Sequence, residues 1–257
     1  MPTAASAAAF ATRIEFVVEL AGQLHRYGTT AQRLEGAIEA VARRLGLDCE
    51  PWSNPTGLIL SFSDPQQPPG VSHTTRVIRL PPGETNLHKL CEADRIAEEV
   101  LAGRLDIVEG HAALRALKRD GGWRSHLQQV AGFGLAAASM AGLLRLPWLD
   151  IATAAVIGTL VGLLVIASRG RPNMAEADDA IAGILAGGLA ALVATFVAPL
   201  NLNTVVIASM IVLMPGMALT NAFSELTSQH LISGTARLFG ALATLLKLTV
   251  GTMIALI

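Results

Sequence analysis

Residues Trp148 to Ser168 read WLDIATAAVIGTLVGLLVIAS, and this stretch decides the class of fold. A helix needs about 20 predominantly apolar residues to cross roughly 30 Å of hydrocarbon. The stretch has that length and carries one charged side chain. Because moving a charge into hydrocarbon costs roughly 2.5–3.5 kcal/mol on insertion scales, we predict a transmembrane helix here.

Charged residues are also rare in the rest of the back half of the chain. Of the 19 basic and 20 acidic residues, 29 lie before residue 127 and ten follow it. The hydrophobic fraction is 52% and the charged fraction 15%, outside the usual range of soluble domains. A net charge of −1 gives no support for nucleic-acid binding through a basic face. The composition therefore predicts a water-soluble front half and a back half that contacts the lipid bilayer.

We predict three segments: a disordered tail over residues 1–12, a small cytoplasmic α+β domain over 13–122, and an α-helical membrane domain of five transmembrane helices over 123–257. Strands are expected near 48–53 and 57–62, between breakers, and over 75–80, where polar and apolar residues alternate. Asn86 and Asp106 are suitable N-caps for two helices that follow the strands.

Five spans fit the back half, at about 127–144, 148–168, 179–200, 202–219 and 232–257. Arg169 and Arg171 lie between the second and third spans, whereas the loop before the second span has only Arg145. Because basic residues gather in cytoplasmic loops, we place the front domain in the cytoplasm and the C-terminus outside.

The fourth span contains a Pro-Gly pair. Pro215 removes one helical hydrogen bond and clashes with the carbonyl of Ile211. In lipid such a break is tolerated only where protein or a wet cavity satisfies the freed groups. Its N–H groups suit a carboxylate and its carbonyls an ammonium, so a zwitterionic amino acid would use both. We expect Pro215, Gly216, Thr220 and Asn221 to line a substrate path; a purely structural kink is the alternative.

Few ionisable residues remain in the predicted membrane domain. Lys247 falls near the middle of the last span, where an unpaired ammonium is costly. Asp178 lies at the start of the third span, where a helix N-terminus favours a carboxylate. Glu225 and Arg237 flank the last loop and are candidates for an ion pair. We predict that Glu225, Asp178 and Lys247 serve either proton coupling or ion pairing.

Signatures of enzymes are missing from the sequence. It has no P-loop, HExxH or GxSxG motif and no His/Cys cluster with metal-ligand spacing. A hydrolytic site could be assembled from Ser53, Thr56, Asp64 and His73, but their spacing does not require one. The two cysteines, Cys49 and Cys91, form no CxxC pair and are expected to be buried, reduced thiols. We therefore assign no catalytic residue, metal or cofactor.

Three segments occur in a distinctive order: NPTGLI from Asn54, TRVIRLPPG from Thr75, and PGMALTN from Pro215, followed by Ser233 and Gly234. In this order they resemble the N-terminal half of the threonine/serine exporter family, from about residue 13 to the end. The resemblance implies a bacterial inner-membrane exporter driven by the proton-motive force. Some members of that family are fusions with about ten spans, and others are split into two genes.

The resemblance leads to one functional expectation and leaves several alternative functions open. With five spans, the chain is expected to be half of a secondary transporter for threonine or serine. It would need a second small five-helix membrane subunit, or would associate with itself. A split relative is associated with succinate, so a dicarboxylate exporter is an alternative. A membrane-anchored enzyme or sensor acting through the front domain, and a passive assembly factor, are the others.

Overall fold

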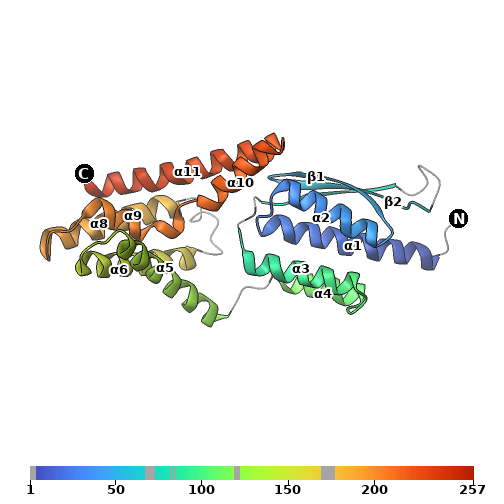
Figure 1. Ribbon diagram of the computed structural model, residues 1–257, viewed down its shortest axis with the longest axis horizontal. Helices are drawn as coiled ribbons and strands as arrows, with labels where there is room; N and C mark the ends of the chain where they lie inside the picture. Colours follow the sequence, from blue (N-terminus) through green and yellow to red (C-terminus); the bar gives the residue numbers. More distant parts are fainter. Residues whose placement is uncertain (1–3, 67–72, 82, 84, 119–121, 169–176) are drawn as a thin grey trace. The chain divides into compact units, whose positions relative to one another are not determined.

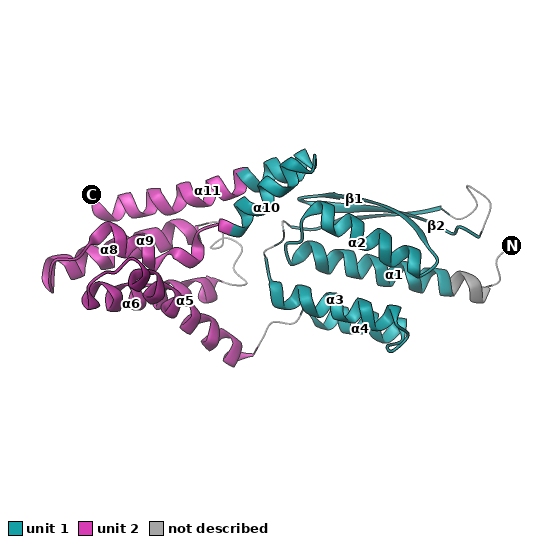
Figure 2. Ribbon diagram, in the orientation of Figure 1, with its two compact units in different colours: residues 1–120, 217–238 teal, residues 121–216, 239–257 magenta. Residues whose placement is uncertain are grey.

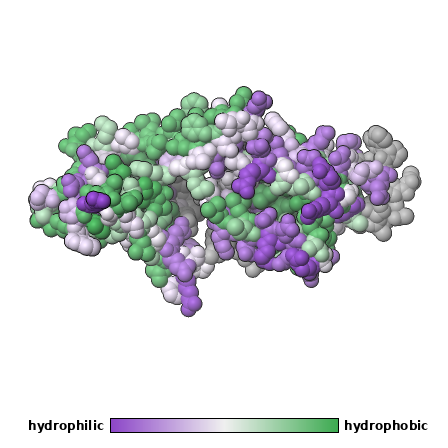
Figure 3. Space-filling view, viewed as in Figure 1, coloured by the Kyte–Doolittle hydropathy of each residue, from purple (hydrophilic) through white to green (hydrophobic). Residues whose placement is uncertain are grey.

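A computed structural model of the protein describes residues 4–66, 73–81, 83, 85–118, 122–168 and 177–257 (Figure 1). The chain forms two compact units, coloured separately in Figure 2. The head unit consists of residues 1–120 and 217–238, and the membrane unit of residues 121–216 and 239–257. Hydrophilic residues gather on the head unit, while hydrophobic residues cover most of the visible surface of the membrane unit (Figure 3).

The head unit combines helices with one small sheet. Its elements are α1 (Ala4–Arg26), α2 (Ala31–Arg44), β1 (Asp48–Asn54), β2 (Gly57–Ser63), β3 (His73–Arg79), α3 (Leu87–Leu101), α4 (Ile107–Ala116), almost all of α10 (Gly216–Thr227) and the start of α11 (Leu231–Leu256). The sheet is antiparallel in the order β1-β2-β3. The helices α1 and α2 contact the sheet, and Phe16, Leu34 and Phe62 are fully buried in the core that they share. The predicted three strands and α+β class of this part are confirmed.

The first helix begins within the segment that we expected to be a disordered tail, residues 1–12. α1 begins at Ala4, and residues 1–3 lie outside the described residues. The segment is rich in alanine, the residue with the highest helix propensity. Further along, the Arg13 guanidinium donates a hydrogen bond to the Leu45 carbonyl oxygen at 2.8 Å, which fixes α1 to the end of α2.

The membrane unit is entirely helical over its described residues. It contains α5 (Trp123–Leu143), α6 (Trp148–Ser168), α8 (Asp178–Phe196), α9 (Leu202–Ser209), the short 3-10 helix η1 (Ile211–Leu213) and the C-terminal part of α11. Small residues allow the closest approach of α5 and α6. A Cβ added at Gly158 would lie 2.6 Å from the Cβ of Ala137, and one at Gly162 would lie 2.9 Å from the Cβ of Phe133.

Three described helices are long and apolar enough to cross a membrane, namely α6, α8 and α11. A fourth candidate is the bent pair Leu202–Ser209 and Ile211–Thr227, which meets at 53°. Helix α5 has 21 residues and packs against α6, but its first turns carry Arg124, His126 and Gln128. The described residues thus show three or four candidate spans, and the predicted first span, at 127–144, stays a prediction.

The division of the chain is less simple than a front half and a back half. We predicted one boundary near residue 122, but residues 217–238 belong to the head unit. The last residues of the predicted fourth span, 202–219, and the first of the fifth, 232–257, therefore pack with the head unit. Buried polar contacts of α10 and α11, described below, account for this association.

Candidate functional site

The predicted break at Pro215 is present and is longer than a single kink. α9 ends at Ser209, and the chain then forms η1 before α10 starts at Gly216. Met214 is extended, with φ −66° and ψ 126°, as a residue before proline prefers. The Gly216 N–H donates to the Met214 carbonyl oxygen at 2.8 Å. This N–H is therefore engaged within the chain, although the sequence indicated that it would be open to a substrate.

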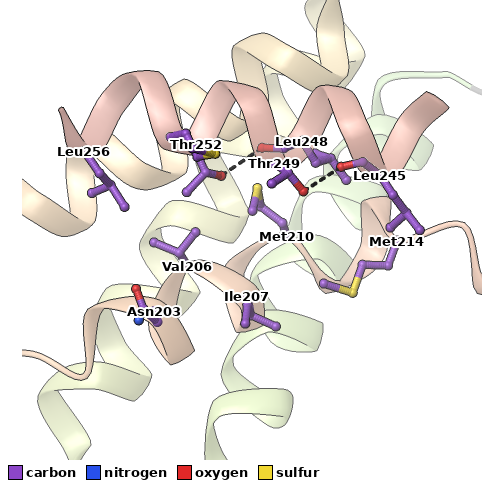
Figure 4. Close-up of a pocket in the computed structure, with 11 residues that line it drawn as sticks. Asn203, Val206, Ile207, Met210, Met214, Leu245, Leu248, Thr249, Thr252 and Leu256 are labelled. Atoms are coloured by element: carbon purple, nitrogen blue, oxygen red, sulfur yellow. Dashed lines mark hydrogen bonds between the residues drawn. The ribbon is translucent and has the colours of Figure 1, made fainter. Parts of the chain in front are cut away.

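A pocket of about 360 Å³ lies beside the break, within the membrane unit (Figure 4). Its lining comes from α9, Met214 and α11: Asn203, Val206, Ile207, Met210, Met214, Leu245, Leu248, Thr249, Thr252, Met253 and Leu256. The hydroxyls of Thr249 and Thr252 donate to the carbonyl oxygens of Leu245 and Leu248, at 2.8 and 2.9 Å. The pocket is therefore largely apolar, with the Asn203 amide as its main polar group.

The four residues of the predicted path are not gathered in one cavity. Neither Pro215 nor Gly216 lines the pocket of Figure 4. Asn221 lines a different pocket, of about 320 Å³, that belongs to the head unit. Thr220, one residue before it on α10, is exposed. The break and Asn221 thus belong to successive parts of the chain, each with its own pocket.

Glu225 is fully buried and holds three hydrogen-bond donors within the head unit. Arg237 donates twice, from Nε to Oε2 and from Nη2 to Oε1, both at 3.1 Å. The backbone N–H of Ala31 donates to Oε1 at 3.0 Å. Because Ala31 is the first residue of α2, the carboxylate also faces the positive end of that helix. Glu225 therefore fastens both α10 and α11 to the start of α2.

A second polar link connects the same parts of the head unit. His230 Nε2 lies 3.0 Å from Glu35 Oε2, and because a carboxylate can only accept, the imidazole N–H is the donor. The other oxygen of Glu35 accepts from the Ser53 backbone N–H at 2.7 Å. Sequence reasoning missed the role of Glu35, which no local pattern signals. Ser53, one member of the hydrolytic alternative, is held here through its backbone and lies in β1.

Lys247 pairs with an acid of another helix inside the membrane unit. Its Nζ lies 3.9 Å from Asp179 Oδ2 on α8. The neighbouring Asp178 differs, because its buried Oδ1 has no hydrogen-bond partner among the described residues. The two adjacent carboxylates at the start of α8 are therefore in different environments.

Asp150 is a buried polar residue that the sequence reasoning passed over. It is 2% exposed, near the start of α6. Its Oδ2 accepts from the backbone N–H of Asn201 at 3.1 Å and from Asn201 Nδ2 at 2.8 Å. This carboxylate fixes the connection that precedes α9. Its position as the single charge of an apolar stretch was the signal that could have found it.

The described residues hold no group of three or more His, Cys, Asp or Glu side chains that could bind a metal ion. In the head unit, burial raises the pKa of the Cys49 thiol to about 12, whereas Cys91 is an exposed free thiol that lines the head-unit pocket. Burial also lowers the pKa of His25, against the hydrogen bond between its Nε2 and the Pro81 carbonyl oxygen at 3.2 Å.

Comparison with known proteins matches the chain to a family. The family model described as "Putative threonine/serine exporter" matches residues 15–257. Pheromone-regulated membrane protein 10 of Yarrowia lipolytica is 24% identical over 89% of the chain, and that of Zygosaccharomyces rouxii is 25% identical over 93%. The chain spans only 19% and 24% of the length of these two relatives. No solved structure matches the chain significantly. With three or four candidate spans and a family match over nearly its whole length, this multi-pass membrane protein belongs to the threonine/serine exporter family, a family of transporters and not of enzymes.

Proposed function

We propose that the chain is a subunit of a secondary transporter that exports threonine or serine from the bacterial cytoplasm. The observation that carries the proposal is the interrupted helix from Met210 to Pro215, next to a pocket of about 360 Å³ in the membrane unit. Helices broken within the membrane are where secondary transporters bind substrates and coupling ions. An interruption of six residues is also more than a structural kink needs, since one proline suffices for a kink.

The residues proposed for the substrate path are Pro215, Gly216, Thr220 and Asn221, which follow one another along the chain. Pro215 keeps α9 and α10 apart, and Gly216 starts α10, whose N-terminus favours a carboxylate. Thr220 and Asn221 follow within the next turn and a half and offer a hydroxyl and an amide. Because the Gly216 N–H already donates to Met214, the substrate would meet the later groups of the first turn.

The contacts of the charged residues support different roles for them. Glu225 is satisfied by Arg237 and Ala31, so its protonation would break an established set of hydrogen bonds. Lys247 faces Asp179. The Oδ1 of Asp178 is buried and has no hydrogen-bond partner among the described residues, unlike the oxygens of Glu225. We propose Asp178 as the coupling residue and the other two as ion-pairing residues.

The complete transporter is proposed to contain more than one copy or kind of chain. A chain that covers about a fifth to a quarter of its curated relatives supplies only part of what they contain. With α5 as a fifth span, the C-terminus would lie outside, and a second five-helix subunit could run with inverted topology. Self-association is the other arrangement. The head unit would face the cytoplasm.

Efflux from intact cells tests the proposal. Bacteria lacking the gene and its neighbour are loaded with a threonine dipeptide, and threonine, serine and succinate are followed in the medium. We expect faster threonine and serine efflux when this gene is restored together with its neighbouring membrane-protein gene. Cells that carry the vector without the two genes should show no change in efflux. Faster efflux of succinate alone would assign a dicarboxylate exporter. Unchanged efflux of all three compounds would contradict transport and favour a membrane-anchored enzyme or sensor.

A further inference from the structure

We propose that the head unit contains a second small-molecule site, the pocket of about 320 Å³, which binds the ammonium and carboxylate groups of a free amino acid. The ligand class rests on the proposed export of amino acids, and the site itself rests on the residues of the pocket. Its volume is at the lower end of the range of small-molecule sites, about 300–1,000 Å³. It therefore suits a ligand of a few heavy atoms better than a nucleotide.

Three separate segments of the head unit, within residues 24–37, 85–94 and 217–221, form the walls of this pocket. The turn between α1 and α2 supplies Gly28, Thr29 and Thr30, and Thr85 precedes α3. The remaining lining residues are Leu24 on α1, Arg33 and Ala37 on α2, Leu87, Leu90, Cys91 and Asp94 on α3, and Met217 and Asn221 on α10. Polar groups thus share the pocket with leucine side chains, as in a site for a small amphipathic molecule.

The turn that carries the threonines is fixed by a tight contact. Gly28 has a φ of +79°, a conformation that side chains with a Cβ rarely adopt. A Cβ at this position would also lie 2.8 Å from the Cα of Thr85. The backbone segments at Gly28 and Thr85, which both line the pocket, are therefore in close contact. Such a preformed wall lowers the ordering that ligand binding would require.

Two helices supply opposite charges to the pocket. Arg33 on α2 and Asp94 on α3 form no ion pair among the described residues. Other exposed arginines of the same helices do pair locally, Arg43 with Glu39 and Arg95 with Glu92 and Glu99. A zwitterion could satisfy both charges at once, its carboxylate at the guanidinium and its ammonium at the carboxylate.

Two threonine hydroxyls lie in the turn between α1 and α2. Thr30 is 8% exposed and directly precedes α2, yet its side chain does not cap the helix. The Oγ1 of Thr29 is buried without a hydrogen-bond partner among the described residues. Buried polar groups are almost always hydrogen-bonded in native proteins. Together with the Asn221 amide, these hydroxyls are available to the polar atoms of a ligand.

The distribution of charge selects among small metabolites. A dicarboxylate would place its second negative group against Asp94, and like charges in one site repel each other. The apolar part of the wall, Leu24, Leu87 and Leu90, suits a short side chain. A neutral amino acid such as threonine or serine is therefore favoured over succinate.

The pocket and the Glu225 contact share one turn of the chain. The Thr29 carbonyl oxygen accepts from Arg237 Nη2 at 3.5 Å, and Ala31 donates to Glu225. Asn221 lies one helical turn before Glu225 on α10. A ligand that orders Thr29, Thr30 and Asn221 would therefore stabilise the attachment of α10. The site would act as a cytoplasmic sensor of the amino acid that the transporter exports.

Cys91 offers a readout specific to this pocket. It is an exposed thiol in the lining, whereas Cys49, the other cysteine, is buried and has a pKa raised to about 12. The full chain in detergent micelles is treated with N-ethylmaleimide, and labelling of Cys91 is followed by peptide mass spectrometry. We expect threonine and serine to slow this labelling saturably and succinate to leave it unchanged. Labelling rates that no amino acid alters would overturn the proposal.

Variants then test the two charges with matched controls. Arg33→Gln should raise the half-protecting threonine concentration about tenfold or more, because a charged hydrogen bond is lost, and Arg44→Gln on the same helix should not. Asp94→Asn should act likewise, with Glu98→Gln as its control. Threonine methyl ester should protect the wild type poorly and protect Arg33→Gln as well as threonine does. Equal protection by threonine and its ester in the wild type would overturn the assignment of Arg33.

Two measurements keep the outcomes separate. Labelling of the buried Cys49 reports that a variant is unfolded. If Arg33→Gln is unfolded in this sense, Arg33→Lys, which keeps the positive charge, replaces it, and the threonine concentration that half-protects Cys91 should then be intermediate. Threonine efflux is measured separately, in cells that express the same variants. Efflux without protection of Cys91 would reject the head-unit site alone, and protection of Cys91 without efflux would reject the exporter function alone.

Discussion

Glu225 and Arg237 form a bidentate ion pair in which the carboxylate is fully buried and the guanidinium is mostly buried. The pair joins two helices that the sequence assigns to the membrane domain, and it is located in the head unit. Since Glu225 also accepts from the first residue of α2, one carboxylate links α10 and α11 to α2 within the head unit.

We predict that Glu225→Gln destabilises the head unit by about 3–5 kcal/mol, because it leaves a buried guanidinium without its counter-charge. Thermal unfolding of the full chain in detergent, followed with a probe in the head unit, measures the loss. Arg43→Gln is the control, since its pair with Glu39 is exposed and exposed pairs contribute less than about 1 kcal/mol. Equal losses in the two variants would contradict the role given to Glu225.

Gly28→Ala should destabilise the head unit more than Gly103→Ala does. Both glycines have a positive φ, +79° and +68°, so both variants carry backbone strain of about 1–3 kcal/mol. Only at Gly28 would the new Cβ also meet the backbone of Thr85, whereas nothing lies within 4 Å of it at Gly103. Thermal unfolding of the two variants separates the steric contact from the strain. The same shift for both would show that Thr85 can move away.

The head unit should lose stability as the pH falls from 7.5 to 5.5. Burial lowers the pKa of His25 from its ordinary value of 6.5, so the folded head unit favours neutral imidazole while the unfolded chain takes up a proton. The stability from this group is complete above about 6.5 and is lost as the pH falls toward the lower, folded value. His25→Gln should flatten the dependence of the unfolding temperature on pH in this range. The exposed His88→Gln should keep the wild-type slope, and a variant at His25 with that same slope would refute the assignment.

At lower pH a second group should contribute. Burial alone would raise the pKa of Glu19, but hydrogen bonds from Lys118 and Gln23 outweigh it and lower the pKa from 4.5. A depressed carboxyl pKa gives stability that is present above 4.5 and is lost as the pH falls through the folded value. Glu19→Gln should therefore change the unfolding temperature above pH 5 and have less effect near pH 3. A difference from the wild type that is constant over this range would contradict the prediction.

Helix packing in the membrane unit offers a further test. Gly158→Leu should separate α5 from α6, because even a Cβ at this position would lie 2.6 Å from the Cβ of Ala137. A loss of several kcal/mol is expected, as for overpacking at a close helix crossing. Gly142→Leu has no neighbouring atom within 4 Å of the new Cβ and should leave the unfolding temperature nearly unchanged. The reverse order would refute the packing of α5 on α6.

Local sequence patterns predicted the soluble elements well, since each depends on neighbouring residues. Asn86 and Asp106 were assigned as N-caps, and their side chains accept from the N–H groups of Lys89 and Val108, both at 3.0 Å. The strand expected over 57–62 is β2, Gly57–Ser63. The proline break was also predictable, because Pro215 acts on its own helix.

Contacts between distant segments could not be predicted in the same way. Ala31 and Glu225 are 194 residues apart, and no periodicity in either helix indicates the other. The pocket beside α2 likewise needs three segments to come together, and Arg33 and Asp94 line it from two of them. The grouping of α10 with the head unit follows from such contacts, which the apolarity of the sequence does not reveal.

The most direct test of the account is the initial rate of threonine efflux from dipeptide-loaded cells that express the chain with its neighbouring subunit, compared between wild type, Pro215→Ala and Pro199→Ala. Pro199 lies in the connection between α8 and α9 and outside both helices, so it controls for loss of a proline. We predict that wild type and Pro199→Ala export threonine well above the empty-vector rate and that Pro215→Ala loses most of this activity. A wild-type rate equal to that of the empty vector would contradict export, and an unchanged rate in Pro215→Ala would contradict a path through the break.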